Sequence, residues 1–211
     1  MLILAGLGNP GPKFEKNRHN VGFMAIDAIA DRWGVSPWRG KFQGLVCEAS
    51  IKTPDGAVRA ALIKPQTFYN ETGRAIGEMM RFFKATPDDV IVFYDEIDLA
   101  PGRFRMKKGG GAAGNNGVRS TTAQIGDGFR RARIGTGHPG DKALVYGHVL
   151  SDFHKADKVW LDPLLEAIVD ALPFAAAGDD ERYQAEVLRL APSEKADPRK
   201  AAKTPGKGDG D

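Results

Sequence analysis

The sequence predicts an α/β fold: one domain built on a mixed β-sheet with helices packed against it. Short apolar runs such as residues 2–5 and 90–94 have the length and composition of buried strands. Between such runs lie segments with apolar residues at three- and four-residue spacing, which is typical of amphipathic helices. With 211 residues and 42% hydrophobic content, the chain can bury one core, so a single domain is expected.

The first third of the chain predicts a strand, a helix and a hairpin. Residues 2–5 are apolar and end at a glycine, as a buried first strand does. Residues 21–33 place apolar side chains on one helical face, and Gly34 follows as a stop signal. Two β-rich segments, 43–51 and 57–64, flank the turn sequence Thr-Pro-Asp-Gly, which predicts a hairpin.

The remainder alternates between helical and strand patterns, which favours a sheet with covering helices. The predicted helices are residues 71–84, 118–125 and 157–172, and the predicted strands are residues 90–94, 103–107 and 131–135. Residues 192–211 consist mainly of Lys, Ala, Pro, Gly and Asp and cannot bury enough apolar surface to become ordered. We therefore expect one folded domain over residues 1–191 and a disordered, basic, Pro- and Gly-rich tail over residues 192–211.

Composition excludes several classes of protein. No stretch of about 18 apolar residues occurs, so no membrane segment is predicted. The first residues lack the basic and apolar regions of a signal peptide. The single cysteine, Cys47, permits no intramolecular disulfide and is expected to be a small apolar filler. These features favour a cytoplasmic location.

Positive charge is concentrated in one segment, although the net charge of the chain is only +3. Between residues 103 and 133 a single acid, Asp127, stands among eight basic residues. Such a segment favours an anion-binding face, whereas the alternative is a solvated surface balanced by acids elsewhere. The basic residues are Arg103, Arg105, Lys107, Lys108, Arg119, Arg130, Arg131 and Arg133.

The first strand is followed by Gly-Leu-Gly-Asn-Pro-Gly at residues 6–11, which formally matches the dinucleotide-binding pattern. That pattern requires a helix to open within the loop so that its amide groups meet the pyrophosphate. Here prolines interrupt the loop and the helical pattern starts only near Asn20. A loop that presents Asn9 at the end of a strand is the favoured interpretation.

A histidine and an aspartate stand where a general base could be assembled. His19 precedes the helix predicted at residues 21–33, and Asp95 closes the buried strand at residues 90–94. Ligands gather at the carboxyl edge of such sheets, and a carboxylate there can orient an imidazole and stabilise its charged form. Helix capping or a surface histidine is the alternative, and no convincing set of metal ligands accompanies the pair.

Water is the expected nucleophile if the chain is a hydrolase. No Gly-x-Ser-x-Gly motif occurs, and the lone cysteine lacks a catalytic signature. Asparagine amides can position a water molecule because each offers two donors and one acceptor oxygen. Asn9, Asn70 and Asn116 lie in loops suited to this, although a simple turn is the favoured explanation of the Asn-Gly pair at residues 116–117 taken alone.

Six segments stand out along the chain: GLGNPG (6–11), RHNVGF (18–23), KPQTFYNETG (64–73), DEIDLAPG (95–102), GGGAAGNNGVRS (109–120) and RIGTGHPG (133–140). In this order they resemble the bacterial peptidyl-tRNA hydrolase family. Each is weak alone, but together they cover the chain to about residue 190. The resemblance implies a single α/β domain with a twisted mixed sheet flanked by helices. It also implies an enzyme of translation that hydrolyses the ester between a peptide and the 3′ end of tRNA.

The resemblance implies roles for individual residues. His19 would be the general base, and Asp95 would hold its ring nitrogen. Asn116 would position the attacking water or the peptide carbonyl. The substrate-binding positions would be Asn9, Phe14, Tyr69, Asn70 and Asn116.

Lys107 and Arg133 would bind tRNA phosphate at the acceptor end, and both lie in the basic segment described above. The resemblance implies no metal and no organic cofactor. The partner would be peptidyl-tRNA, bound by a monomer with no obligate protein partner and no membrane. Residues 141–155 resemble a segment that forms a mobile flap over the peptide groove.

Two positions depart from the family pattern. Many members have Met at position 69 and His at position 115, where this chain has Tyr69 and Asn115. We expect Tyr69 to add a ring and a hydroxyl to the wall of the substrate groove. We expect neither change to touch His19 or Asp95, so activity should be retained with altered affinity.

Two other classes of function are compatible with parts of the sequence. An RNA-binding protein without catalysis would use the same basic face and keep the His–Asp pair as scaffold, including splicing factors descended from this fold. A nucleotide-dependent oxidoreductase would use the glycine loop at residues 6–11. Substitution of His19 distinguishes the first from an enzyme, and thermal protection by nicotinamide cofactors tests the second.

Overall fold

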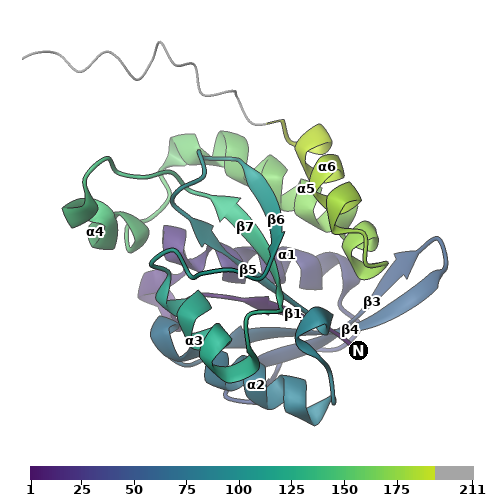
Figure 1. The fold of residues 1–211 in the computed structure, drawn as a ribbon. Coiled ribbons are helices and arrows are strands. Elements are labelled where there is room, and N and C mark those ends of the chain that lie inside the picture. Colours follow the sequence, from purple (N-terminus) through teal and green to yellow (C-terminus); the bar gives the residue numbers. More distant parts are fainter. Residues whose placement is uncertain (193–211) are drawn as a thin grey trace, which may run out of the picture.

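A seven-stranded sheet forms the centre of the computed structural model, which describes residues 1–192 (Figure 1). The strands are β1 (Leu2–Gly6), β2 (Arg39–Lys41), β3 (Gly44–Thr53), β4 (Gly56–Pro65), β5 (Val90–Glu96), β6 (Phe104–Lys108) and β7 (Arg130–Gly135). Their order is β2-β3-β4-β1-β5-β7-β6. The central strands β4, β1, β5 and β7 pair in parallel, and β2, β3 and β6 join antiparallel at the edges. The predicted α/β class with a mixed sheet is confirmed.

Helices cover both faces of this sheet. The α-helices of the described residues are α1 (Val21–Trp33), α2 (Thr72–Phe82), α3 (Asn116–Ile125), α4 (Val145–Val149), α5 (Lys158–Ala176) and α6 (Asp180–Leu190). The helices α1, α5 and α6 pack on one face, whereas α2 and α3 pack on the other. Figure 1 shows these two layers with the sheet between them. Three short 3-10 segments also matter for the site: η1 (Pro12–Phe14), η2 (Arg18–Asn20) and η3 (Tyr69–Glu71).

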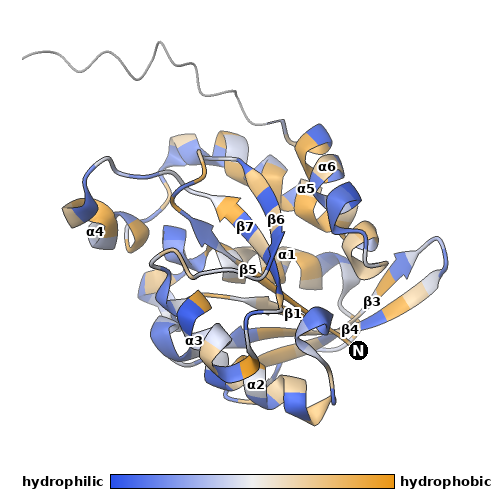
Figure 2. Cartoon of the chain, in the orientation of Figure 1, coloured by the Kyte–Doolittle hydropathy of each residue, from blue (hydrophilic) through white to orange (hydrophobic). Residues whose placement is uncertain are grey.

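The central strand β1 is apolar throughout because both of its faces are buried. Successive side chains of a strand point to opposite faces, so Leu2 and Leu4 of β1 join the core beneath α1 and α5. Ile3 and Ala5 join the core beneath α2 and α3. The covering helices carry both hydrophilic and hydrophobic residues, as amphipathic helices do (Figure 2). The chain therefore has two cores separated by one sheet.

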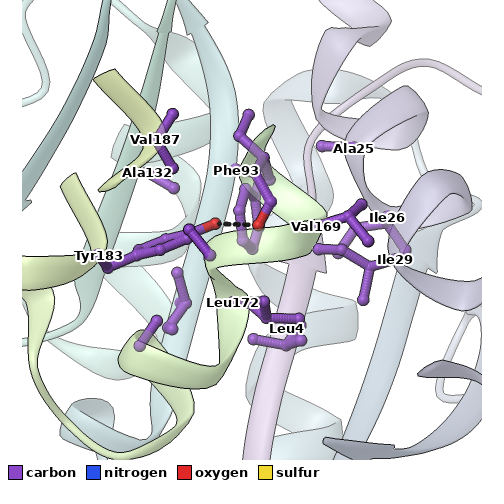
Figure 3. Packing of buried hydrophobic residues seen from close by; sticks show 14 of the residues in the cluster. Leu4, Ala25, Ile26, Ile29, Phe93, Ala132, Val169, Leu172, Tyr183 and Val187 are labelled. Carbon is purple, nitrogen blue, oxygen red and sulfur yellow. Dashed lines mark hydrogen bonds between the residues drawn. The ribbon is translucent and has the colours of Figure 1, made fainter. Parts of the chain in front are cut away.

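The last helix closes the first of these cores. Tyr183 of α6 is fully buried against Phe104, and its hydroxyl donates to the carbonyl oxygen of Ile168 at 3.1 Å (Figure 3). Burial, above all, raises the pKa of Tyr183 well above its ordinary value. Arg130 donates to Asp180 and to the carbonyl oxygen of Ala175, which attaches the beginning of α6 and the end of α5 to β7.

Most predicted elements are confirmed, with ends that shift by a few residues. The sequence missed β2, α4 and α6. The first two have three and five residues, too short for a periodic pattern, and α6 buries only Tyr183 and Val187 in a charged segment. Of the predicted tail at residues 192–211, all but Pro192 lies outside the described residues. In the described part of the chain, no helix is both long and apolar enough to cross a membrane.

Candidate active site

The candidate site lies where two parallel strands end. β1 continues into a loop whose Leu7 amide donates to the carbonyl oxygen of Phe93 at 2.9 Å, so the loop that carries Asn9 runs beside the end of β5. The neighbouring segment η2 precedes α1 directly and carries His19. Parallel strands bring their carboxyl ends to the same edge, which is the usual position of a site in this class of fold. The glycine loop leads into η1 rather than into a long helix, as expected from its prolines.

His19 and Asp95 are in direct contact across this edge. The Nδ1 atom of His19 lies 2.9 Å from each carboxylate oxygen of Asp95. The side chain of His19 is 16% exposed, whereas that of Asp95 is 1% exposed. A carboxylate can only accept hydrogen bonds, so Nδ1 carries the proton and the neutral ring keeps its lone pair on Nε2. This arrangement can serve as a general base supported by a buried anion.

Tyr69 contacts both members of this pair. Its ring stacks on the imidazole of His19, with ring centroids 3.5 Å apart and an interplanar angle of 12°. Its hydroxyl donates to Oδ1 of Asp95 at 2.9 Å and accepts from Nδ2 of Asn115 at 3.0 Å. The residue is 5% exposed. Burial, and next the charge of Asp95, raise the pKa of Tyr69 well above its ordinary value, so the phenol remains a neutral donor.

Asn9 is held in one orientation by its neighbours. Its Oδ1 atom accepts from the backbone amide of Tyr69 at 2.9 Å. Asn20 binds the backbone of Asn9 twice: its Oδ1 accepts from the Asn9 amide and its Nδ2 donates to the Asn9 carbonyl, both at 2.9 Å. The Nδ2 group of Asn9 is thereby the part of the side chain left for a substrate. The sequence did not single out Asn20, although it stands next to His19.

The other predicted substrate-binding residues lie at the rim. Asn70 is exposed in η3, and Asn116 is exposed at the start of α3, where its Oδ1 accepts from Arg119 at 3.2 Å. Phe14 is partly exposed at the end of η1, with the Lys13 ammonium 4.7 Å from its ring centre. Within the described residues, no hydrogen bond or ring contact joins Phe14 to His19 or Asp95.

Two cavities adjoin the site. One, of about 330 Å³, is lined by residues that include Asn9, Asn20, Phe23, Met24, Asp27 and Lys64. The other, of about 560 Å³, lies beyond the end of β5 and is lined by residues that include Arg18, Asp98, Thr136, His138 and His148. Among residues 1–192, no cluster of three His, Cys, Asp or Glu side chains is placed to hold a metal ion.

The sequence model of the family described as "Peptidyl-tRNA hydrolase" matches residues 3–195. The chain belongs to this family. It is 71% identical over 203 residues to the peptidyl-tRNA hydrolase of Caulobacter vibrioides, an alignment that covers 96% of this chain and 99% of that protein. It is 67% identical over 209 residues to the peptidyl-tRNA hydrolase of Phenylobacterium zucineum, covering 99% and 100%.

Solved structures of peptidyl-tRNA hydrolases have the same fold. The crystal structure of peptidyl-tRNA hydrolase from Acinetobacter baumannii superposes with a TM-score of 0.84 at 30% identity, over 92% of this chain and 97% of that one. The resemblance stated from six motifs is therefore confirmed for the family and for the fold.

The expectation that Tyr69 and Asn115 leave His19 and Asp95 untouched is wrong. The ring of Tyr69 is buried and its hydroxyl donates to Asp95, whereas its place in the wall of the substrate groove stays a prediction. Asn115 was expected to leave the His–Asp pair untouched, but its amide group binds the Tyr69 hydroxyl and lies 3.5 Å from the carbonyl oxygen of Asp95. Tyr69 and Asn115 thus reach His19 or Asp95 directly or through one hydrogen bond.

The basic segment is less available to anions than its composition predicts. Arg131 is 1% exposed and donates to the carbonyl oxygens of Gly110 and Gly111. Arg130 is engaged by Asp180, as described above. Arg133 donates through Nε and Nη2 to Glu96, and its side chain is 22% exposed. These three arginines are paired within the protein. The expected anion-binding face is therefore limited to the basic residues of the segment that are exposed.

Lys107 is the predicted phosphate ligand that remains on the surface. It is exposed on β6, the edge strand of the sheet. Residues directly opposite in an antiparallel pair share a face, and so do alternate residues of one strand. The register pairs Lys107 with Arg131 and Arg105 with Arg133, so Lys107 and Arg133 project from the same face of the sheet.

The segment after α4 is fastened to the residues around His19. Arg18 is 6% exposed and donates to the Ser151 hydroxyl at 2.8 Å, to the Asp152 carbonyl at 2.7 Å and to Asp157 at 3.0 Å. Asn17 donates to the Asp152 carboxylate at 2.7 Å. The end of the predicted flap at residues 141–155 is therefore anchored beside the candidate base.

Proposed function

We propose that the chain hydrolyses the ester bond that joins a peptide to the 3′ end of tRNA in peptidyl-tRNA, with His19 as general base and water as nucleophile. The observation that carries this proposal is the contact of His19 Nδ1 with the buried Asp95 carboxylate at 2.9 Å. It leaves Nε2 as the basic atom, and the names of the relatives point to the substrate.

In the proposed reaction, one proton moves from water to His19 and then to the leaving ribose oxygen. Nε2 of His19 takes a proton from water as the oxygen attacks the ester carbonyl carbon, and Asp95 stabilises the imidazolium. The resulting tetrahedral oxyanion collapses by breaking the bond to the ribose oxygen, which receives the proton from the imidazolium. The products are a peptide carboxylic acid and tRNA with a free hydroxyl.

In this proposal, asparagine side chains assist the reaction. The Nδ2 group of Asn9 can donate to the ester or to the oxyanion because its Oδ1 is already occupied by Tyr69. We assign Asn70 and Asn116 at the rim to substrate and water positioning, and Phe14 to peptide contact. One such donor to an oxyanion contributes about 3–4 kcal/mol in enzymes where it has been removed.

Lys107 is the principal phosphate ligand in this proposal. Its ammonium is on the surface, whereas two nitrogens of the Arg133 guanidinium already donate to Glu96. Arg133 would bind phosphate through its third nitrogen or after exchange of partners. Electrostatic contacts of this kind strengthen binding at low salt and contribute less at high salt.

The proposal is tested by peptide release from N-acetyl-aminoacyl-tRNA. We expect His19→Ala and Asp95→Asn to lower kcat by about 10²- to 10⁴-fold, since general-base catalysis contributes that much. His138→Ala is the matched control, because His138 is exposed and its Nδ1 accepts from the Gly140 amide. Release by His19→Ala at the wild-type rate would contradict the assignment of His19 as the base. A wild-type protein that binds tRNA but releases no peptide above the uncatalysed rate would favour an RNA-binding protein without catalysis.

Phosphate binding is tested separately by salt dependence. Lys107→Ala should raise KM and lower the slope of log KM against log salt by about one charge contact. Lys108→Ala is the control, because the neighbouring ammonium already pairs with Asp88. Equal effects of the two substitutions would show that Lys107 has no specific role.

A further inference from the structure

Tyr69 and Asn115 form a short chain of hydrogen bonds that ends on the candidate base. Nδ2 of Asn115 donates to the Tyr69 hydroxyl at 3.0 Å, and that hydroxyl donates to Oδ1 of Asp95 at 2.9 Å. The same carboxylate binds Nδ1 of His19. The Asp95 carboxylate thus accepts hydrogen bonds from two residues, His19 and Tyr69.

The direction of these hydrogen bonds is fixed by the beginning of α3. Asn115 is the N-cap of that helix, and its Oδ1 accepts from the Val118 amide at 3.0 Å. Turning the amide over would place two donors against each other at Val118, so Nδ2 must face Tyr69. The hydroxyl oxygen of Tyr69 then accepts, and its single proton points to Asp95.

The ring of Tyr69 holds the imidazole from the side. The two rings are nearly parallel with centroids 3.5 Å apart, which restricts rotation of the His19 ring about its bond to Cβ. Gly117 leaves room for the tyrosine, because a Cβ there would lie 2.6 Å from Cε1 of Tyr69. One side chain therefore fixes both the plane of the base and the carboxylate that orients it.

We propose that Tyr69 and Asn115 act together as positioning residues that hold Asp95 and His19 in the geometry required for base catalysis. The inference rests on the proposed function in that His19 is taken as the base. Tyr69 is buried and donates to Asp95, so it acts through the base and not on the substrate. Asn115 acts through Tyr69, so its effect depends on the hydroxyl.

The experiment separates the hydroxyl from the ring. Tyr69→Phe keeps the stacked ring and removes the donor to Asp95. Asn115→Ser keeps an oxygen that can cap α3 and removes the donor to Tyr69. We expect kcat to fall about tenfold in Tyr69→Phe and about threefold in Asn115→Ser, with KM within about twofold of wild type, because a hydrogen bond to a charged group is lost in the first and only weakened in the second.

Tyr183→Phe is the matched control. That tyrosine is also buried, and its hydroxyl donates to the carbonyl oxygen of Ile168, but it lies in α6 away from the site. It should lower thermal stability without changing kcat. A fall in kcat of similar size in Tyr183→Phe would show that the effect of Tyr69→Phe comes from general loosening of the core and would overturn the inference.

The double variant tests whether the two residues act as a pair. If Asn115 works through the hydroxyl, Tyr69→Phe combined with Asn115→Ser should be no slower than Tyr69→Phe alone. Independent action would instead multiply the two single effects, to about thirtyfold on the values expected above. That outcome would overturn the pairing.

A spectroscopic measurement reads the position of His19 without any turnover. In protein labelled with ¹⁵N-histidine, the resonances of the His19 ring nitrogens and of the Nδ1 proton should move in Tyr69→Phe and in Asn115→Ser, and stay unchanged in Tyr183→Phe. Unchanged resonances in folded Tyr69→Phe would overturn the inference even if His19→Ala is inactive. Conversely, an active His19→Ala would remove the proposed role of His19 as base, while the resonances would still report whether Tyr69 positions the ring.

Discussion

Replacement of Gly22 by alanine should displace the candidate base, because the start of α1 has no room for a side chain. A Cβ at Gly22 would lie 2.3 Å from the carbonyl oxygen of Phe93 and 2.6 Å from both the amide nitrogen and the carbonyl oxygen of Leu7. Cβ atoms essentially never approach within 3.0 Å of such atoms, so the helix must retreat by about 0.7 Å from the backbone of two strand ends. His19 lies three residues earlier and would move with it.

The expected magnitudes follow from that displacement. Overpacking of this kind costs about 1–3 kcal/mol, and contact with backbone on two sides favours the upper half of the range. A loss of about 2 kcal/mol lowers Tm by roughly 4–8 °C in a domain of this size. A shift approaching 1 Å in a catalytic group can lower the rate by about 10²-fold, so we expect kcat to fall about 10- to 100-fold.

Thermal unfolding and peptide release would be measured on the same preparations. Gly40→Ala serves as the control, since a Cβ there has no neighbour within 4 Å and Gly40 lies on the edge strand β2. It should leave kcat unchanged and leave stability equal or raised by up to about 1 kcal/mol. A Gly22→Ala protein with wild-type Tm and wild-type kcat would refute the argument that close packing at this glycine sets the position of His19.

Three further substitutions test other parts of the structure. Arg18→Met removes a buried charge that pairs with Asp157, and it should lower the free energy of unfolding in urea titrations by about 2 kcal/mol, a value kept modest because Asp157 is 23% exposed to solvent. It should also increase proteolysis of residues 148–157, and unchanged proteolysis would contradict the anchoring role. Asn20→Ala should lower kcat/KM about tenfold through loss of the two contacts that hold Asn9, and a wild-type value would show that Asn9 is held without them. Burial raises the pKa of Tyr183, so above pH of about 10 the unfolded chain loses a proton that the folded chain keeps, and stability falls as pH rises; the fall should be shallower in Tyr183→Phe, and equal slopes would contradict this.

The fold could be predicted because its signals are local. At residues 2–5, 21–33 and 90–94, the spacing of apolar residues indicates a strand or a helix within the segment itself. Each of these elements is confirmed within two residues at either end. The helix α6 could not be found this way, since most of its residues are polar and its attachment depends on Arg130, which lies 50 residues before Asp180. The helix α6 therefore depends on contacts with distant parts of the chain and not on the pattern of its own residues.

Charge along the sequence predicted the surface poorly for a related reason. A count of arginines treats each one as solvated, whereas Arg130, Arg131 and Arg133 find a carboxylate or carbonyl partner that the sequence does not place beside them. A strand in the interior of the sheet, such as β7, can hold such side chains only if they are paired. Lys107, on the edge strand, meets no such requirement.

The positions of His19 and Asp95 followed from the ends of predicted elements, but the roles of Tyr69 and Asn115 required the distance between them. A buried hydroxyl must donate to an acceptor and benefits from a donor to its own oxygen, which makes a tyrosine beside Asp95 acceptable only when its surroundings supply both. Asn115 supplies the donor and still caps α3. Considered singly from the sequence, Tyr69 and Asn115 each suggest only a change in affinity. The hydrogen bond between them joins residues 46 positions apart, and it makes the role of Asn115 depend on the Tyr69 hydroxyl. Without the Tyr69 hydroxyl the Asn115 amide would lose this acceptor, so the two side chains are expected to act as a pair.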